Sequence, residues 1–344
     1  MRRSIVALVL TGLLAACSSS GKASAPAAST STAATTTTTL PRCTVTTQTS
    51  LQRIDLKVGG KARYALVHMP TDWDGKTKVP LILSFHGLGA SAENQRTTDG
   101  FVARSDEDRF IVVYPQAGIA SAYGAAWDLK GEGDVPYVTA LLDAIEARAC
   151  VDTSRVYATG LSYGGAMTDL VACELADRFA AVAPVSAYLP KRTCTPSRPV
   201  PVMSLHGVED QLLPYAGGGR SDQTSFEAWG AAWAKRDGCA GGPTDKQYKA
   251  TVEELSFSGC DASVVLYRVH HNGHTWPGHP LGLDRQALID FFSGKGSGKP
   301  YPLMVLLGLT PEGFADTISL ANSDIDASDM ILAFFKQHAL VSAP

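Results

Sequence analysis

The chain has 344 residues, a formal net charge of -3 and a hydrophobic content of 45%. This nearly balanced charge gives no electrostatic basis for binding nucleic acid or an anionic membrane surface. The residues from 43 onward are enough for one large α/β domain with a sizeable core.

The first 17 residues resemble a bacterial lipoprotein signal. Two arginines precede an apolar stretch, residues 5–16, that is too short to span a bilayer. The stretch ends in Leu14-Ala15-Ala16-Cys17, which resembles a lipobox, so we expect cleavage before Cys17 and a lipid on its thiol. The alternative is an ordinary secretory signal that contains a cysteine. Both readings predict export, either to the outer face of the cell membrane as a lipoprotein or as a secreted protein.

Residues 18–42 are mostly Ser, Thr, Ala and Pro and include five consecutive threonines. Such a composition cannot bury a core, so it predicts a disordered tether. The tether and the lipid would be the only link to a membrane. We therefore place the folded domain at residues 43–344.

Strand-like and helix-like patterns alternate along this domain. Apolar or alternating runs predict strands at residues 63–69, 80–85, 110–114, 156–159, 179–184, 200–205 and 263–269. Helical spacing predicts helices at residues 135–149, from 166 onward, at 226–235 and at 325–336, the last beginning at Asp324 or Asp326. This order predicts a mostly parallel sheet covered on both faces, with any active site at the carboxyl ends of its strands.

A candidate nucleophile lies where a predicted strand meets a predicted helix. Gly160-Leu161-Ser162-Tyr163-Gly164 is a G-x-S-x-G sequence, and its two glycines permit the close contacts of a sharp strand-to-helix turn. The turn would expose the Ser162 hydroxyl near a helix N-terminus, where negative charge is favoured. By composition alone the pentapeptide is also a common loop.

A base and an acid are expected after Ser162, in the order Ser, acid, His. Four of the eight histidines cluster at residues 270–279, and we expect the base to be His274, in a loop rich in turn residues, with His271 in reserve. A metal site built from these histidines is the rival reading, although no carboxylate or cysteine follows at ligand spacing. The expected acid is Asp210, after the strand at 200–205, and Glu209 beside it is the alternative.

Two backbone N–H groups should form an oxyanion hole. One belongs to Tyr163, directly after the nucleophile, and the other to Leu88, between Gly87 and Gly89 in the loop after an early strand. In this arrangement His86 is a structural hydrogen-bonding residue and not a base.

Six cysteines remain after Cys17, and an even number in an exported chain predicts disulfides. Many pairings are possible, so our assignment is a hypothesis. We expect Cys239–Cys260 to close a polar loop, Cys173–Cys194 to join the end of the helix after Ser162 to a later loop, and Cys43–Cys150 to form the remaining pair. No C-x-x-C pair supports a metal site.

The combined motifs resemble the secreted polyhydroxybutyrate depolymerase and feruloyl esterase family of α/β hydrolases. The residues that carry the resemblance are His86-Gly87, Gly160 to Gly165, Ala181 to Val185, His206-Gly207-x-x-Asp210 and Gly273 to Gly278, over roughly residues 50 to 280 and the last helix. The resemblance implies a single α/β-hydrolase domain, an ester substrate, no cofactor and a Ser162–His274–Asp210 triad. It also implies that Trp276, and with it Trp127, lines the substrate cleft, although either could be plain core.

The chain departs from that family between Pro280 and Asp324, where it carries a long insert. Residues 300–309 are strongly apolar and could form a lid, a surface for an insoluble substrate or buried packing, which we favour slightly. We expect a polyhydroxybutyrate depolymerase-like esterase, with feruloyl or acetylxylan esterase as the alternative. A surface binding protein on an inactive hydrolase scaffold is the non-enzymatic alternative.

Overall fold

A computed structural model describes residues 43–218, 223–280, 284–295 and 300–341. The predicted signal peptide, Cys17 and the tether lie outside these residues. From Leu40 onward the chain forms one compact unit. No helix among the described residues has the length and apolarity needed to cross a membrane.

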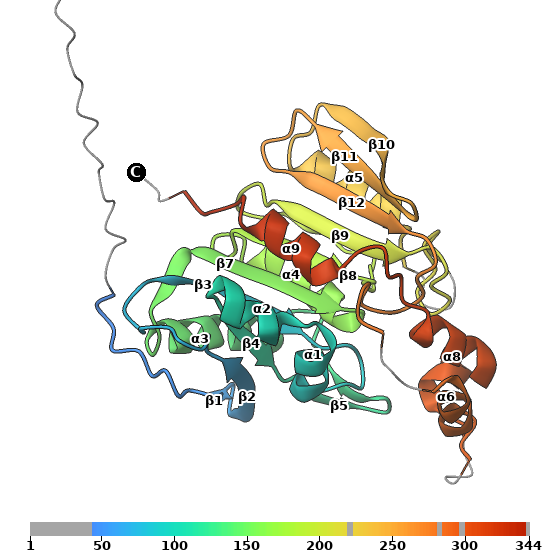
Figure 1. Ribbon diagram of the computed structural model, residues 1–344, viewed down its shortest axis with the longest axis horizontal. Coiled ribbons are helices and arrows are strands. Elements are labelled where there is room, and N and C mark those ends of the chain that lie inside the picture. The colour runs from blue at the N-terminus through green and yellow to red at the C-terminus, as the bar shows by residue number, and fades with distance from the viewer. Residues whose placement is uncertain (1–42, 219–222, 281–283, 296–299, 342–344) are drawn as a thin grey trace, which may run out of the picture. The chain divides into compact units, whose positions relative to one another are not determined.

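A ten-stranded sheet forms the centre of the domain (Figure 1), in the order β1-β2-β4-β3-β7-β8-β9-β12-β11-β10. The six strands from β4 to β12 in that order are parallel, and antiparallel pairs extend both edges. The strands are β1 (Arg53–Val58), β2 (Lys61–His68), β3 (Val79–Phe85), β4 (Ile111–Pro115), β7 (Val151–Leu161), β8 (Ala181–Val185), β9 (Val202–Gly207), β10 (Gly241–Lys249), β11 (Val252–Ser258) and β12 (Val264–Val269). A separate small hairpin pairs β5 (Ile119–Ser121) with β6 (Gly124–Ala126).

The buried stretches of the central strands are mostly apolar because both faces of the sheet are covered. In β3, Leu81 and Leu83 belong to one hydrophobic cluster, while Ile82 belongs to another on the opposite face. Successive side chains of a strand point to opposite faces, so a strand buried on both sides is apolar at nearly every position.

Helices cover the two faces of the sheet. In Figure 1, α2 and α9 lie on the near side, and α3, α4 and α5 lie on the far side, which agrees with the two clusters. The helices of the domain are α1 (Ala92–Thr98), α2 (Phe101–Asp108), α3 (Asp134–Glu146), α4 (Tyr163–Glu174), α5 (Phe226–Arg236) and α9 (Ala327–Phe335). Asp326, one of the two expected starts of the last helix, caps α9 with its side chain. The predicted α/β-hydrolase fold with a mostly parallel central sheet is confirmed.

The segment between Cys239 and Cys260 is not the polar loop that we expected. It folds as the β10–β11 hairpin, which extends the sheet at its edge. Nearly every residue of β10 is exposed, so the strand shows no apolar alternation that could have identified it.

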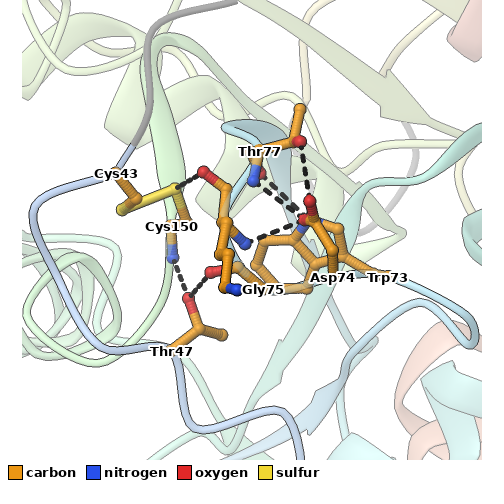
Figure 2. Close-up of a disulfide and its surroundings, with 8 residues drawn as sticks. Cys43, Thr47, Trp73, Asp74, Gly75, Thr77 and Cys150 are labelled. Atoms are coloured by element: carbon orange, nitrogen blue, oxygen red, sulfur yellow. Dashed lines mark hydrogen bonds between the residues drawn. A yellow bond between two sulfur atoms is a disulfide. The ribbon is translucent and has the colours of Figure 1, made fainter.

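The six cysteines pair as Cys43–Cys150, Cys173–Cys194 and Cys239–Cys260. Figure 2 shows the first pair and the turn beside it, where the Thr47 hydroxyl donates to the Gly75 carbonyl and accepts from the Cys150 N–H. In that turn the Asp74 carboxylate accepts from the N–H groups of Lys76 and Thr77. These bonds fasten the start of the domain to the residue that precedes β7.

The described part of the insert between Pro280 and Asp324 contains the short helices α6 (Arg285–Phe292), α7 (Pro302–Leu307) and α8 (Pro311–Ser319). Its buried side chains form a third hydrophobic cluster together with Leu212 and Leu213, from the loop after β9. Within the apolar stretch 300–309, Met304 is buried while Val305 is 56% exposed. The expected packing is therefore present at Met304, and the same insert also borders a cavity described below.

Candidate active site

Ser162 occupies a strained turn between β7 and α4. Its backbone has φ 60° and ψ -117°, an unusual conformation for a residue with a side chain that typically costs about 1–3 kcal/mol. The Ser162 N–H donates to the Val185 carbonyl, and the Ser162 carbonyl accepts from the Tyr188 N–H. These bonds hold the turn in place.

The two glycines of the turn are required by close backbone contacts. A Cβ on Gly160 would lie 2.6 Å from the Phe85 carbonyl oxygen, and one on Gly164 would overlap the same carbonyl. The small residues that the G-x-S-x-G sequence supplies therefore let β7 and α4 meet directly beside the end of β3.

Asp210 and His274 form a buried hydrogen-bonded pair. The Asp210 Oδ2 atom lies 2.7 Å from Nδ1 of His274, and the two residues are 3% and 9% exposed. The other oxygen, Oδ1, accepts from the backbone N–H groups of Leu212 and Leu213 at 3.0 and 2.9 Å. Because the carboxylate is an acceptor, the proton of a neutral His274 is assigned to Nδ1, which leaves Nε2 to accept a proton.

The alternative acid, Glu209, and the other histidines of the 270–279 cluster make contacts away from the Asp210–His274 pair. Glu209 accepts a hydrogen bond from the Asn272 N–H at 3.3 Å, and His271 is exposed. His270 lies 3.5 Å from Glu253, and His279 lies 3.0 Å from Asp326. Across the described ranges, no three His, Cys, Asp or Glu side chains are grouped so that they could hold a metal ion.

Ser162 and His274 line the same cavity, of about 680 Å³. Within the described part of the chain, no hydrogen bond joins the Ser162 hydroxyl to the His274 imidazole. Such bonds are often long without substrate and tighten in the reactive complex. The cavity is lined by residues of α1 and of the insert helices α6 and α8. Figure 1 shows where these helices lie relative to the sheet. The cavity lining includes no Asp, Glu, Lys or Arg among the described residues.

The loop after β3 passes directly beside the nucleophile. A Cβ on Gly87 would lie 3.4 Å from the Ser162 Cβ, and Leu88 lines the cavity. Gly89 has φ 76° and donates its N–H to the Ala125 carbonyl at 2.8 Å, which fixes the loop. The N–H groups of Leu88 and Tyr163 have no acceptor among the described residues, as the two donors of an oxyanion hole require.

His86 is a buried structural residue, as its placement before this loop suggested. Nδ1 donates to the Gly87 carbonyl at 2.7 Å, and Nε2 accepts from the Ala117 N–H at 3.1 Å. Burial lowers the pKa of its imidazole, so both bonds are made by the neutral ring.

The Trp127 indole N–H donates to the His86 carbonyl at 2.8 Å, and its ring is 2% exposed. The expectation that Trp127 lines the cleft is therefore wrong, since this ring supports the loop after β3 from within the core.

Trp276 borders the cavity but is completely buried. Its indole N–H donates to the Ser328 hydroxyl at 2.9 Å, and its ring meets Phe101 edge to face at 5.9 Å between centroids. The ring therefore packs as core beneath the cavity. It offers no accessible face to a substrate in this conformation.

Two buried residues that contact the Asp210–His274 pair were not identified from the sequence. His206, in β9, donates from Nε2 to the Leu213 carbonyl and lies 3.5 Å from the Asp210 carboxylate. Burial lowers the pKa of its imidazole, so the ring is neutral. Thr317, on α8 of the insert, accepts the His274 N–H with its carbonyl. No motif marks Thr317, because its role arises only when the insert folds back onto the loops.

The chain resembles several esterases in sequence. It is 28% identical over 242 residues to feruloyl esterase B of Piromyces equi, a match that covers 64% of this chain and 44% of that protein. It is 29% identical over 218 residues to the bifunctional acetylxylan esterase/xylanase of Neocallimastix patriciarum, covering 62% and 31%. It is 27% identical over 243 residues to the probable feruloyl esterase C of Aspergillus terreus, covering 67% and 84%. The chain thus spans less than half of the first two relatives.

A model of the prolyl oligopeptidase family also matches residues 102–195, which include the Ser162 turn. The sheet order and the strained serine at the end of β7 define the class, the α/β hydrolases. Within this class, the chain is similar in sequence to feruloyl esterases.

Proposed function

We propose that the protein is an exported serine hydrolase that cleaves carboxylic esters through an acyl-enzyme on Ser162. The observation that carries this proposal is the single cavity that Ser162 shares with His274, whose imidazole is held by Asp210 at 2.7 Å. A nucleophile, a base and an orienting carboxylate are the three parts that such chemistry needs.

In the proposed mechanism, His274 Nε2 takes the proton from the Ser162 hydroxyl as the oxygen attacks the ester carbonyl. The Leu88 and Tyr163 N–H groups donate to the oxyanion, and each such donor is typically worth about 3 kcal/mol of transition-state stabilisation. The protonated His274 gives its proton to the leaving alcohol, and the carbon–oxygen bond breaks to leave the acyl group on Ser162. Water, deprotonated by His274, then releases the acid and restores the serine.

The polar environment explains why Asp210 can serve as the orienting group. Two backbone N–H groups and the His274 ring satisfy its carboxylate, so the buried charge is not left unpaired. Asp210 would hold the imidazole in the required tautomer and stabilise the imidazolium that forms in each step.

For the substrate, we propose an uncharged ester of the plant cell wall, feruloyl or acetyl. The named activities of the relatives favour it over polyhydroxybutyrate, which the sequence alone had placed first. Polyhydroxybutyrate remains the second candidate because the insert adds an apolar wall to the cavity. Assays with methyl ferulate, acetylated xylan and polyhydroxybutyrate would rank the three.

Export is proposed from two features. The three disulfides favour an oxidising compartment outside the cytosol, and the N-terminal segment resembles a lipoprotein signal. If Cys17 carries lipid, Cys17→Ser should move the protein from the membrane fraction to the soluble fraction. An unchanged distribution would argue against the lipid anchor.

The direct test of the catalytic proposal is Ser162→Ala. Hydrolysis of p-nitrophenyl acetate should fall by about 10⁴-fold or more, with an unchanged melting temperature. Ser263→Ala, at an exposed serine before β12, is the matched control and should keep full activity. Full activity in the Ser162 variant would refute the proposal. A wild-type protein without activity on any ester would favour the alternative of a binding protein on an inactive scaffold.

A further inference from the structure

The insert supplies one wall of the cavity with aromatic rings. Phe292 packs against Phe314 with centroids 4.4 Å apart and against Tyr301 at 5.5 Å. Phe291, beside them, is 65% exposed although it lines the cavity. A large aromatic ring left in water at a cavity wall is a surface that gains free energy when an apolar group covers it.

Tyr301 adds a hydrogen-bonding group to this wall. Its hydroxyl lies 3.1 Å from the position that a Cβ on Gly89 would take, so it sits next to the oxyanion loop. Burial raises the pKa of its phenol, which therefore remains a donor at neutral pH. The hydroxyl has no hydrogen-bond partner among the residues that the structure describes.

The opposite wall is different in chemistry. Asn94, Thr97 and Thr98 of α1 line it, and they bring amide and hydroxyl groups without formal charge. Among the described residues that line the cavity, an ionised group of a ligand would find no opposite charge. The two walls together select a neutral molecule with one apolar side.

We propose that Phe291, Phe292 and Phe314 form a subsite for an uncharged apolar acyl group and that Tyr301 donates a hydrogen bond to an oxygen close to the ester bond. This inference rests on the proposed esterase function and names the part of the substrate that the insert binds. It makes the insert a determinant of acyl-chain preference. A short acetyl group would not reach the wall, whereas a longer apolar chain would cover Phe291.

Phe291→Ala tests the subsite without disturbing the core, because the ring is mostly exposed. We expect the ratio of kcat/KM for p-nitrophenyl hexanoate to that for p-nitrophenyl acetate to fall about three- to tenfold. The matched control is Val305→Ala, an exposed apolar residue of the same insert that does not line the cavity. A ratio within twofold of wild type in Phe291→Ala, or an equal loss in both variants, would overturn the subsite.

Tyr301→Phe keeps the ring and removes only the hydroxyl. It should lower kcat/KM on both esters about three- to tenfold, which is the usual range for one lost hydrogen bond. Tyr248→Phe, in the exposed strand β10, should have no effect. Unchanged kinetics in the Tyr301 variant would remove the hydrogen bond from the proposal.

A binding experiment separates failure of the subsite from failure of the esterase function. The ligand is N-(4-nitrophenyl)hexanamide, the amide analogue of p-nitrophenyl hexanoate. Calorimetry with this ligand on the Ser162→Ala protein requires no catalysis. We expect Phe291→Ala to weaken binding about three- to tenfold in this background. If the wild type hydrolyses no ester but the anilide still binds in a Phe291-dependent way, the proposed function fails and the subsite stands. Equal affinity with and without the ring overturns the subsite alone.

A separate set of bonds carries a second inference, at the end of α8. The Thr317 hydroxyl accepts from the Gln211 N–H at 3.0 Å, next to Asp210, and its carbonyl accepts from the His274 N–H. Thr317 is 1% exposed. A Cβ on Gly273 would overlap the Thr317 carbonyl, so the histidine loop lies directly against the helix end. We infer that Thr317 is a positioning residue. It fixes the loop that carries Asp210 and the loop that carries His274 relative to each other.

Thr317→Val keeps the shape of the side chain and removes the hydroxyl acceptor. We expect kcat to fall about tenfold while KM stays within twofold, and Thr317→Ser should restore activity. The matched control is Thr310→Val, which removes the hydroxyl cap from the start of the same helix. It should lower the melting temperature without changing kcat. A loss of kcat in Thr310→Val equal to that in Thr317→Val, or no loss in Thr317→Val, would overturn the inference.

Discussion

The two ends of the parallel strands differ in what they carry. Ser162, Asp210 and His274 all follow the carboxyl ends of strands, on strained or glycine-rich turns. The covalent cross-links lie at the other end. Cys150 precedes β7, and Cys173 is in the last turn of α4, which runs back from the catalytic end.

The remaining disulfide and a buried carboxyl group also lie at the end of the sheet opposite Ser162. Cys239 follows α5, Cys260 precedes β12, and the Asp237 carboxylate accepts from the Val200 N–H just before β9. From this comparison we infer that the cross-links stabilise the end of the sheet away from the proposed catalytic residues. The turns that carry those residues can then hold strained backbone conformations. Changes at the two ends should therefore separate activity from stability.

The largest expected effect is at the catalytic end. Asp210→Asn should lower kcat by about 10⁴-fold, because an amide can donate to His274 and favours the wrong tautomer. Steady-state kinetics and a melting curve would show loss of activity with nearly unchanged stability. Glu209→Gln is the matched control and should keep activity, since Glu209 contacts the Asn272 N–H instead. Similar losses in both variants would mean that Glu209 shares the role.

Removing the Cys43–Cys150 disulfide should have the next largest effect, on stability alone. The bond joins residues 107 apart, and the double Cys→Ser variant should lose about 4–5 kcal/mol in the free energy of unfolding. The shorter Cys239–Cys260 link, with a separation of 21, should cost about 3 kcal/mol when removed. Urea unfolding measures both. A fall in kcat/KM of the still-folded protein would contradict the separation of the two ends.

Gly164→Ala should lower both the stability and the activity of the protein. The new methyl group would overlap the Phe85 carbonyl, so we expect a loss of about 3 kcal/mol in stability together with most of the activity. Gly242→Ala is the control, because a Cβ there meets nothing within 4 Å. A Gly164 variant as stable and active as wild type would show that the turn tolerates a side chain.

The smallest effect concerns the pH dependence of stability. Burial raises the pKa of the Asp237 carboxyl to about 7, above the ordinary value near 4. The folded state therefore holds this proton between about pH 4 and 7 while the unfolded state releases it, so stability is lost as pH rises through this window. Asp237→Asn should flatten that loss in urea unfolding at pH 5 and 8. Asp72→Asn, at an exposed position, should keep the wild-type slope, and equal slopes in all three proteins would contradict the account.

The central strands and the elements around Ser162 could be predicted because local signals agree there. The strand predicted at residues 156–159 lies within β7, the apolar run at 80–85 lies within β3, and the G-x-S-x-G sequence marks the turn. Asp210 could be located for the same reason, since a turn directly after a buried strand places it at the catalytic edge. Its pairing with His274, 64 residues later, followed only from the order of motifs.

The insert and the edge strands could not be predicted to the same degree. Strand β10 has no buried residue, so it carries no periodic signal. The insert helices have cap residues that could have been noticed, Thr310 before Pro311 and Asp284 before Arg285. Which of their side chains face the cavity depends on contacts with the loop after β9, and spacing along the chain does not encode such contacts.

The central claim is that Ser162 is a nucleophile activated by His274. Peptide mapping by mass spectrometry after treatment with a fluorophosphonate tests it most directly, because only an activated serine reacts quickly. We expect one adduct per molecule, on the peptide that contains Ser162, and a rate at least about 100-fold lower in His274→Ala. Labelling at another residue, or equally fast labelling without His274, would contradict the claim.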